Sequence, residues 1–346
     1  MTSRERLLAA IRGDRVDRVP VAPFGLGRLD PNSEICRELI ARTDPFISPG
    51  AGGDPFLGSA VPTTTTVEGD VTTTVFHTPK GNLTRRWRRT AATAAQVEYP
   101  LRTPADVEKA LAMPYAPPAI NLKPYREWKE RVGDEALVMV GLANAICTPA
   151  SWFSPEDFCL AWADAPDVLR QLCQVASDRL LAFVTRLLDE GVDAFRIVGG
   201  EYASVQLGPE AFRALVTPFD TELVDLIRRR GAIAYYHNHG KVMQYLEMLA
   251  DLGIDALDPL EAPPWGDTDL REAMRRIGDR VCLVGNLDDM EIINQWPTDE
   301  VLALARERLA AAGNRHFILG GTASGTYTEH GARNFIAMAE MVARET

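Results

Sequence analysis

Cysteine, histidine and long runs of one character are scarce in this sequence. Its five cysteines are scattered among 346 residues without C-x-x-C spacing, so neither a disulfide framework nor a zinc-finger module is expected. No apolar run approaches the roughly 20 residues of a membrane span, and the amino terminus lacks the apolar core of a signal peptide. A net charge of -11 without a long basic stretch argues against nucleic acid and anionic membranes as partners. We expect a reduced, cytoplasmic protein, either a monomer or a homodimer.

From about residue 134 onward, short apolar runs alternate with amphipathic helical patterns. The apolar runs cover residues 136–140, 194–198, 232–236, 254–257, 281–284 and 316–319, and residues 19–23 form a further candidate strand. Such alternation is typical of βαβ units in a parallel sheet. No G-x-G-x-x-G or Walker-type motif supports a doubly wound nucleotide-binding sheet. We therefore expect an α/β fold, a TIM (β/α)8 barrel, in a single domain over residues 1–346.

The segment at about residues 61–101 has a different character. Residues 63–67 and 71–76 are rich in threonine and valine, and Gly81-Asn82 has the composition of a turn. This pattern predicts an antiparallel β insertion early in the barrel. In the simplest interpretation it covers one end of the barrel, and a lid or a surface for a partner is the alternative.

Two of the five histidines stand in one tripeptide, His237-Asn238-His239, directly after an apolar run and before Gly240. In an α/β protein the carboxyl end of a strand is where ligands collect. Two histidines at positions i and i+2 of a strand end can both reach one metal ion. The alternative is that one imidazole forms a hydrogen bond in the core while the other faces solvent.

Polar or titratable groups follow five consecutive predicted strands. They are Glu201 after the first, His237 and His239 after the second, Asp258 and Glu261 after the third, Asn286 after the fourth, and Ser324 after the fifth. A barrel brings the carboxyl ends of its strands to one rim, so these groups are expected in one pocket.

The two histidines with a carboxylate make a nitrogen and oxygen ligand set suited to Zn²⁺, with open positions for water or substrate. Glu201 is the preferred third ligand because it lies on the preceding strand end and adds negative charge. Glu261 is the alternative, either as a ligand or as a group that orients an imidazole. Each acid could instead cap a helix or form a solvated salt bridge.

At these residues the sequence resembles the uroporphyrinogen decarboxylase superfamily, which includes zinc- and corrinoid-dependent methyltransferases. The resemblance covers nearly the whole chain. The segments that carry it are residues 3–13 with 17–21, 237–240, 252–261, 285–288, and 317–321 through 334–338. These landmarks are specific to the superfamily and do not distinguish one activity within it.

Departures from the family's motifs separate its branches. The porphyrinogen decarboxylases carry M-R-Q-A-G-R after the first strand, and here only the final Gly27-Arg28 matches. The methyltransferases bind zinc with a H-x-C motif and a later cysteine. Here His239 replaces the first cysteine and Ser324 the second, and a neutral hydroxyl is a poor zinc ligand. His330 could replace the missing ligand, although its position favours the first turn of the last helix.

The resemblance therefore implies a zinc-dependent methyltransferase that moves a methyl group from a small, methoxylated substrate to a corrinoid (cobalamin) on a partner protein. In this interpretation Glu261 or Asp258 relays a proton to the leaving oxygen. The expected substrate-binding residues are Arg28, Asn286, Tyr236, Trp265 and Ser324, and Tyr327 is a further aromatic of the pocket wall. Two alternatives stay open: a decarboxylase acting on a carboxylate substrate, and a non-catalytic member that binds a ligand.

Overall fold

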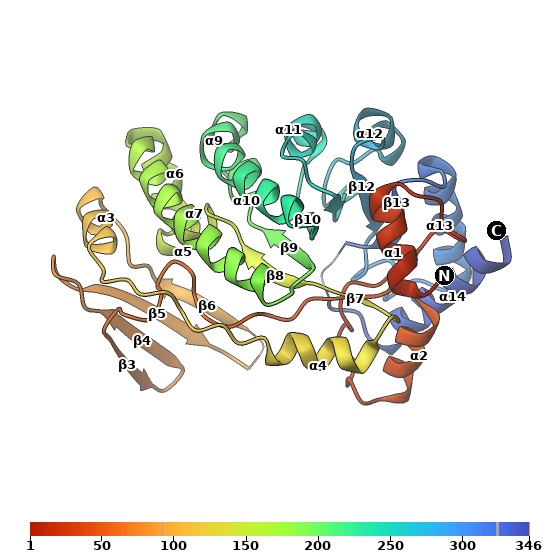
Figure 1. Cartoon of the computed structure of the whole chain (residues 1–346), viewed down its shortest axis with the longest axis horizontal. Coiled ribbons are helices and arrows are strands. Elements are labelled where there is room, and N and C mark those ends of the chain that lie inside the picture. Colours follow the sequence, from red (N-terminus) through yellow and green to blue (C-terminus); the bar gives the residue numbers. More distant parts are fainter. Residues whose placement is uncertain (92, 323–324, 346) are drawn as a thin grey trace.

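The computed structural model describes residues 1–91, 93–322 and 325–345, and its central feature is a parallel sheet surrounded by helices (Figure 1). Seven strands pair in the order β1-β13-β12-β11-β10-β9-β8, each parallel to its neighbours. Their bounds are β1 Val21–Ala22, β8 Val140–Ala143, β9 Ala194–Val198, β10 Ile233–His237, β11 Ala256–Asp258, β12 Cys282–Leu287 and β13 Phe317–Gly321. The apolar runs of the sequence therefore form the predicted strands.

Two short strands close the sheet into a barrel. Strand β2 (Phe46–Ile47) pairs in parallel with β7 (Leu137–Val138), and a parallel bridge joins Phe24 to Phe46 next to β1. Strands β7 and β8 are consecutive along the chain, separated by Met139, whose amide donates to the carbonyl of Ile47. Strands β7 and β8 thus occupy one place in the barrel, and the predicted TIM (β/α)8 fold is confirmed.

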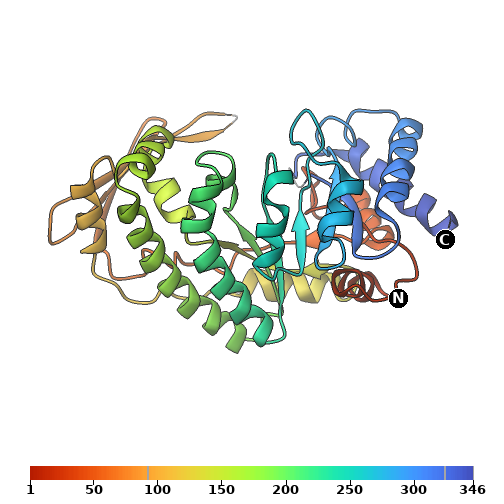
Figure 2. The same cartoon turned by 90° about the horizontal axis from the view of Figure 1, so that it is seen from above.

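Helices follow the strands and cover the outside of the barrel, as the view in Figure 2 also shows. They are α2 Glu34–Arg42, α5 Cys147–Trp152, α6 Pro155–Asp164, α7 Pro166–Asp189, α8 Glu201–Ser204, α9 Pro209–Leu215, α10 Thr217–Arg229, α11 Leu246–Asp251, α12 Leu270–Ile277, α13 Thr298–Ala312 and α14 Glu329–Glu345, with a 3-10 turn η1 at Met243–Tyr245. Residues 209–230 form two helices that divide just before Pro218, because proline has no N–H group to donate to the preceding turn. No helix in the described ranges is long and apolar enough to cross a membrane.

The interior of the barrel is filled by side chains from alternate strand positions. A buried cluster includes Ala194, Ile233, Tyr235, Cys282 and Ile318, whereas their strand neighbours belong to the core between strands and helices. Helix α1 (Ser3–Arg12) closes the amino-terminal end of the barrel, where its apolar side chains join this interior cluster. The carboxyl-terminal end is the one left for polar groups.

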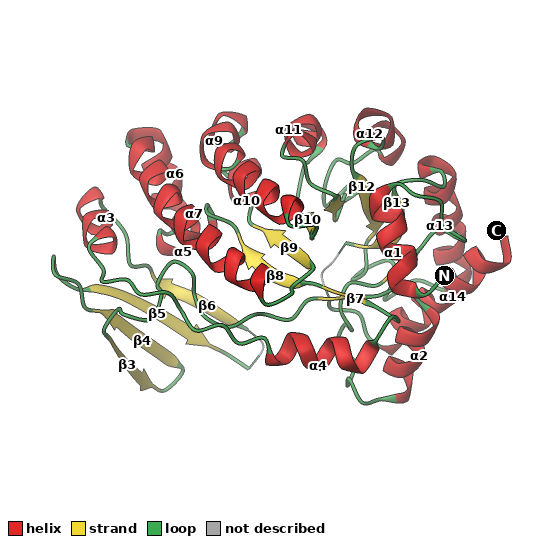
Figure 3. Cartoon of the chain, viewed as in Figure 1, coloured by secondary structure: helices red, strands yellow, loops and turns green. Residues whose placement is uncertain are grey.

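The insertion after β2 is an antiparallel sheet of β3 (Thr63–Glu68), β4 (Val71–Phe76), β5 (Leu83–Arg89) and β6 (Ala94–Glu98). Figure 3 shows this sheet at the end of the molecule opposite the two termini. Its Phe76 ring packs 5.2 Å from that of Trp152 in α5. The chain returns to the barrel through α3 (Pro104–Leu111) and α4 (Lys123–Val132). The predicted antiparallel insertion is therefore present.

Candidate functional site

A buried imidazole and carboxylate meet at the ends of two neighbouring strands. His237 ends β10 and Asp258 ends β11, and the parallel register places them side by side. His237 Nδ1 lies 3.0 Å from Asp258 Oδ1, and the two side chains are 6% and 1% exposed. Burial opposes ionisation of Asp258, but the charge and hydrogen bond of His237, with Arg196 and His239, hold the pKa of this carboxyl below its ordinary value.

A second imidazole–carboxylate pair lies just beyond the strand ends. His239 Nδ1 is 3.0 Å from Glu261 Oε1, and the amide of Gly240 donates to Glu261 Oε2 at 2.6 Å. Gly240 has φ 89°, a conformation that glycine adopts without strain. Burial disfavours a charged His239, but the hydrogen bond and charge of Glu261 raise the pKa of its imidazole. The His239 side chain is 39% exposed, so it can be reached from solvent.

The two rings stand close together in nearly perpendicular planes. Their centroids are 4.4 Å apart, with an interplanar angle of 88°. An ionised carboxylate accepts hydrogen bonds but cannot donate them, so each Nδ1 carries the hydrogen that faces its acid. The Nε2 atoms of His237 and His239 are then the atoms left for a ligand. Imidazoles held by a carboxylate in this way are typical of metal ligands.

A third metal donor does not converge on these rings within the described residues. No group of three His, Cys, Asp or Glu side chains there is placed to hold a metal ion. Glu201 Oε2 accepts from the amide of Gly199 at 3.1 Å, and its charge contributes to the raised pKa of His239. Ser324 lies outside the described residues. The two imidazoles thus fit zinc, and the complete ligand set stays a prediction.

His330 lies away from this pair. It is in the first turn of α14, and its Nε2 is 2.9 Å from the carbonyl oxygen of Trp296. This placement agrees with the helix-turn interpretation rather than with a role as the replacement ligand.

Two of the predicted substrate-binding residues line one cavity at the ends of β12 and β13. Trp265 and Asn286 share a cavity of about 380 Å³ with Trp296 and Arg308. One wall is the segment that begins at Ala262, the residue after Glu261 in the sequence. The Asn286 amide donates to the carbonyl of Leu260, and its Oδ1 has no hydrogen-bond partner among the residues that the structure describes. The cavity therefore combines aromatic walls with charged and polar groups, and the unpaired Asn286 oxygen is buried at its edge.

Three other predicted wall residues lie elsewhere. Tyr236 points away from the barrel interior, is fully buried, and donates from its hydroxyl to Asp220 at 2.5 Å. Tyr327 is also fully buried, with its hydroxyl donating to the carbonyl of Gly25. Arg28 is exposed in the loop after β1 and lines neither this cavity nor the one beside α5. Tyr236 faces the helices rather than the barrel interior, where Tyr235 lies, because adjacent strand residues face opposite sides.

The sequence analysis missed one charged residue in the barrel. Arg196 is the middle residue of β9, beside Tyr235 of β10 in the register. Its guanidinium carbon lies 4.1 Å from the centre of the Phe24 ring, which packs against the barrel interior. Tyr235 in turn packs against Phe24 and Phe46, so aromatic rings form a floor below the histidines. A charge at an inward position of an apolar strand was the available signal.

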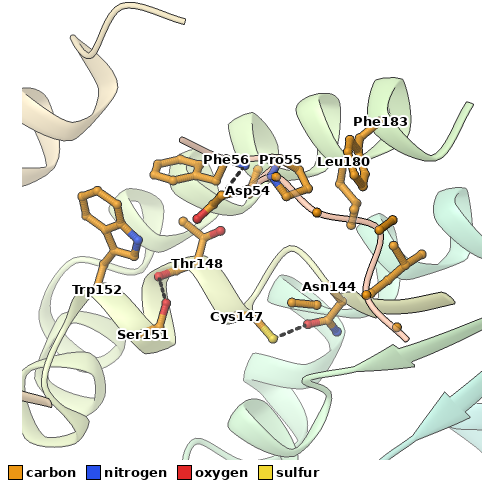
Figure 4. A pocket seen from close by; sticks show the side chains of 18 residues that line it. Asp54, Pro55, Phe56, Asn144, Cys147, Thr148, Ser151, Trp152, Leu180 and Phe183 are labelled. Atoms are coloured by element: carbon orange, nitrogen blue, oxygen red, sulfur yellow. Dashed lines mark hydrogen bonds between the residues drawn. The ribbon is translucent and has the colours of Figure 1, made fainter. Parts of the chain in front are cut away.

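A second cavity, of about 340 Å³, lies between the loop after β2, the end of β8 and helices α5 and α7 (Figure 4). Cys147 faces it and donates from its thiol to the Asn144 Oδ1 atom. Burial, with the nearby charges of Glu201 and Asp220, raises the pKa of the Cys147 thiol well above its ordinary value. This cysteine is therefore kept as a neutral thiol and is unsuited to act as a nucleophile.

The sequence of this chain is similar to those of known proteins from one family. The model of the family "Uroporphyrinogen decarboxylase (URO-D)" matches residues 88–345. The methylcobamide:CoM methyltransferase MtaA of Methanosarcina barkeri is 24% identical over 324 residues, which cover 89% of each chain. A uroporphyrinogen decarboxylase of Methylococcus capsulatus is 29% identical over 216 residues, or 56% of each chain.

A solved methyltransferase structure from Methanosarcina mazei superposes with a TM-score of 0.69 at 17% identity, covering 99% of each chain. That likeness concerns the fold. The family match extends over most of the sequence, including every strand end that carries the histidines and their acids. This chain belongs to the uroporphyrinogen decarboxylase family.

Proposed function

We propose that this protein is a methyltransferase that moves a methyl group between a small substrate and a corrinoid carried by a partner protein. The observation that supports it best is the pair of neighbouring imidazoles, each held through Nδ1 by its own carboxylate. The sequence similarity to a corrinoid methyltransferase over most of both chains is the second support. The methylated atom is proposed to be an ether or alcohol oxygen.

Zinc is the proposed metal, and the Nε2 atoms of His237 and His239 would hold it. Glu201, whose carboxylate accepts from the Gly199 amide in this structure, would have to turn toward the rings to act as the proposed third ligand. When bound, it would act as a Lewis acid on the substrate oxygen. These zinc ligands would include no thiolate, so they would donate less electron density to the metal than cysteine ligands do. A zinc ion held in this way is better suited to polarise a substrate oxygen than to activate a thiol.

The protein's own groups prepare the site. Asp258 is almost fully buried and its pKa is held low, so its proposed role is to fix the ring of His237. Glu261 holds the ring of His239 and the amide of Gly240, and its side chain is 12% exposed. Glu261 is therefore the better placed acid to exchange a proton with the leaving oxygen. The cavity lined by Trp265 and Asn286 would take the rest of the substrate and keep water from it.

The test is methylation of free cobalamin under anaerobic conditions. Purified protein supplied with zinc is mixed with cob(I)alamin and, in separate reactions, with methanol, anisole and 4-methoxybenzoate. We expect enzyme-dependent formation of methylcobalamin, followed by its absorption spectrum, with at least one oxygen-bound methyl donor. Absence of methylcobalamin with all three donors, and of demethylation when methylcobalamin is offered with the corresponding methyl acceptors, would contradict the proposal.

A decarboxylase is the second candidate, and Arg196 in the barrel is the observation that favours it, because a guanidinium can hold the carboxylate of such a substrate. This alternative predicts release of carbon dioxide from a carboxylate substrate such as uroporphyrinogen, without any change in added cobalamin. The two activities are therefore distinguished in parallel assays of one preparation.

A further inference from the structure

The guanidinium of Arg196 has no hydrogen-bond acceptor within the described part of the chain, although it lies inside the barrel. The residue is half-buried, its side chain forms no salt bridge or hydrogen bond with another described residue, and its Nε is buried without an acceptor. One face of its guanidinium rests on the Phe24 ring, a favourable cation–π contact. The edge that carries the N–H groups is left without acceptors.

Two other arginines on the inner side of the chain's surface, Arg6 and Arg18, are paired with carboxylates, whereas Arg85 and Arg308 share with Arg196 a buried Nε without a partner among the described residues. Arg6, which is 7% exposed, contacts Asp17 and Asp44 at 2.6 Å each, and Arg18 contacts Asp44 at 2.7 Å. A buried donor without an acceptor costs free energy because it has lost its bonds to water. The charge of Arg196 helps to lower the pKa of Asp258, but the Asp258 carboxylate already accepts a hydrogen bond from His237. The missing acceptor for Arg196 is therefore expected from a ligand.

We propose that Arg196 binds a carboxylate group of the substrate at the floor of the barrel mouth. This inference rests on the proposed function in one respect, that the mouth with the two histidines is the active site. A guanidinium edge matches the two oxygens of a carboxylate in a bidentate contact. The register neighbour of Arg196 on β8 is Gly141, which has no side chain, and the group nearest to where its Cβ would lie is the Ser48 hydroxyl, at 3.3 Å.

The surrounding charges select a monoanion. Asp258 and Glu261, which hold the two histidines, both lie at or just beyond the ends of the strands that form this mouth. A group with two negative charges, such as a phosphate, would be repelled by these acids, and a single guanidinium would not neutralise it. The substrate class is therefore a small molecule with one carboxylate besides the atom that reacts.

The test is direct binding of small probes to the full chain, measured by calorimetry and by thermal shift without cobalamin or a methyl donor. The probes are acetate, benzoate, the neutral benzamide and phenyl phosphate. We expect a carboxylate to bind the wild-type protein at least about tenfold more tightly than benzamide and phenyl phosphate. We also expect Arg196→Met to weaken carboxylate binding at least about tenfold and Arg196→Lys to weaken it less.

Arg229→Met, an exposed arginine of α10, is the matched control and should leave binding unchanged. Equal binding of benzoate and benzamide, no binding of either carboxylate, tighter binding of phenyl phosphate, or unchanged binding to Arg196→Met would each overturn the proposal. The comparison of probes on the wild-type chain holds even if a variant does not fold. Carboxylate binding without methyl transfer would refute the proposed function alone, and methyl transfer indifferent to Arg196 would refute this inference alone.

Discussion

Replacement of His237 by asparagine is expected to reduce methyl transfer at least about 100-fold and to leave the fold intact. The asparagine amide can occupy the place of Nδ1 and keep the hydrogen bond to Asp258, which is buried. It removes Nε2, the ring atom that the structure leaves for a ligand. The measurement is the cobalamin methylation rate, with circular dichroism and thermal unfolding as checks of the fold.

Two comparisons make this result specific. His316→Asn is the matched control, because His316 lies directly before β13 at the opposite end of the barrel and should show wild-type rates. His237→Ala removes the partner of Asp258 as well and is expected to lower stability, because it leaves a buried carboxylate without its hydrogen bond. Wild-type activity in His237→Asn would refute the role assigned to this imidazole.

Replacement of Asp220 by asparagine is expected to change the pH dependence of stability. Asp220 lies in α10, is 1% exposed, and accepts hydrogen bonds from Tyr236 and Asn144 on the same oxygen, Oδ2. Burial raises the pKa of its carboxyl from 3.8 to about 6. Between these pH values the folded protein holds the proton and the unfolded chain does not. The free energy of unfolding therefore falls as the pH rises through this window and stays lower above it.

The difference between the two pKa values corresponds to about 3 kcal/mol. The asparagine variant has no proton to lose and retains an oxygen acceptor, so its stability relative to wild type should improve by up to that amount between about pH 4 and about pH 7.5. Urea unfolding at both pH values measures it. For Asp225→Asn, on the exposed side of the same helix, the free energy of unfolding should change with pH as it does for the wild type. The same pH dependence in Asp220→Asn and wild type would contradict the raised pKa assigned to Asp220.

The sequence was sufficient to predict the barrel and the rim that carries the polar groups. Strand ends at Val198, His237 and Asp258 follow from apolar runs of the right length, and parallel strands bring their carboxyl ends together. Strand β2 was missed because two residues leave no periodic signal. Its recognition required the tertiary pairing with β7.

The partners of the histidines were less predictable. The prediction preferred Glu201 from the preceding strand as the third ligand and gave Glu261 as the alternative, either as a ligand or as a group that orients an imidazole. The structure pairs the two imidazoles with Asp258 and Glu261 from the following strand. A sequence shows which groups reach a rim, but the register between neighbouring strands decides which atoms touch. The residues that face inward could be counted from the alternation along each strand, which would have excluded Tyr236 and found Arg196.

The most direct test of the two-histidine centre is the metal content of protein purified with and without added zinc. It is measured beside a His237→Asn/His239→Asn double variant, which can keep both hydrogen bonds to the carboxylates. We expect about one zinc ion per chain in the wild type, as one ligand set can hold one ion, and none in the double variant. No zinc in the wild type even after zinc is added, or equal zinc in both proteins, would contradict the account.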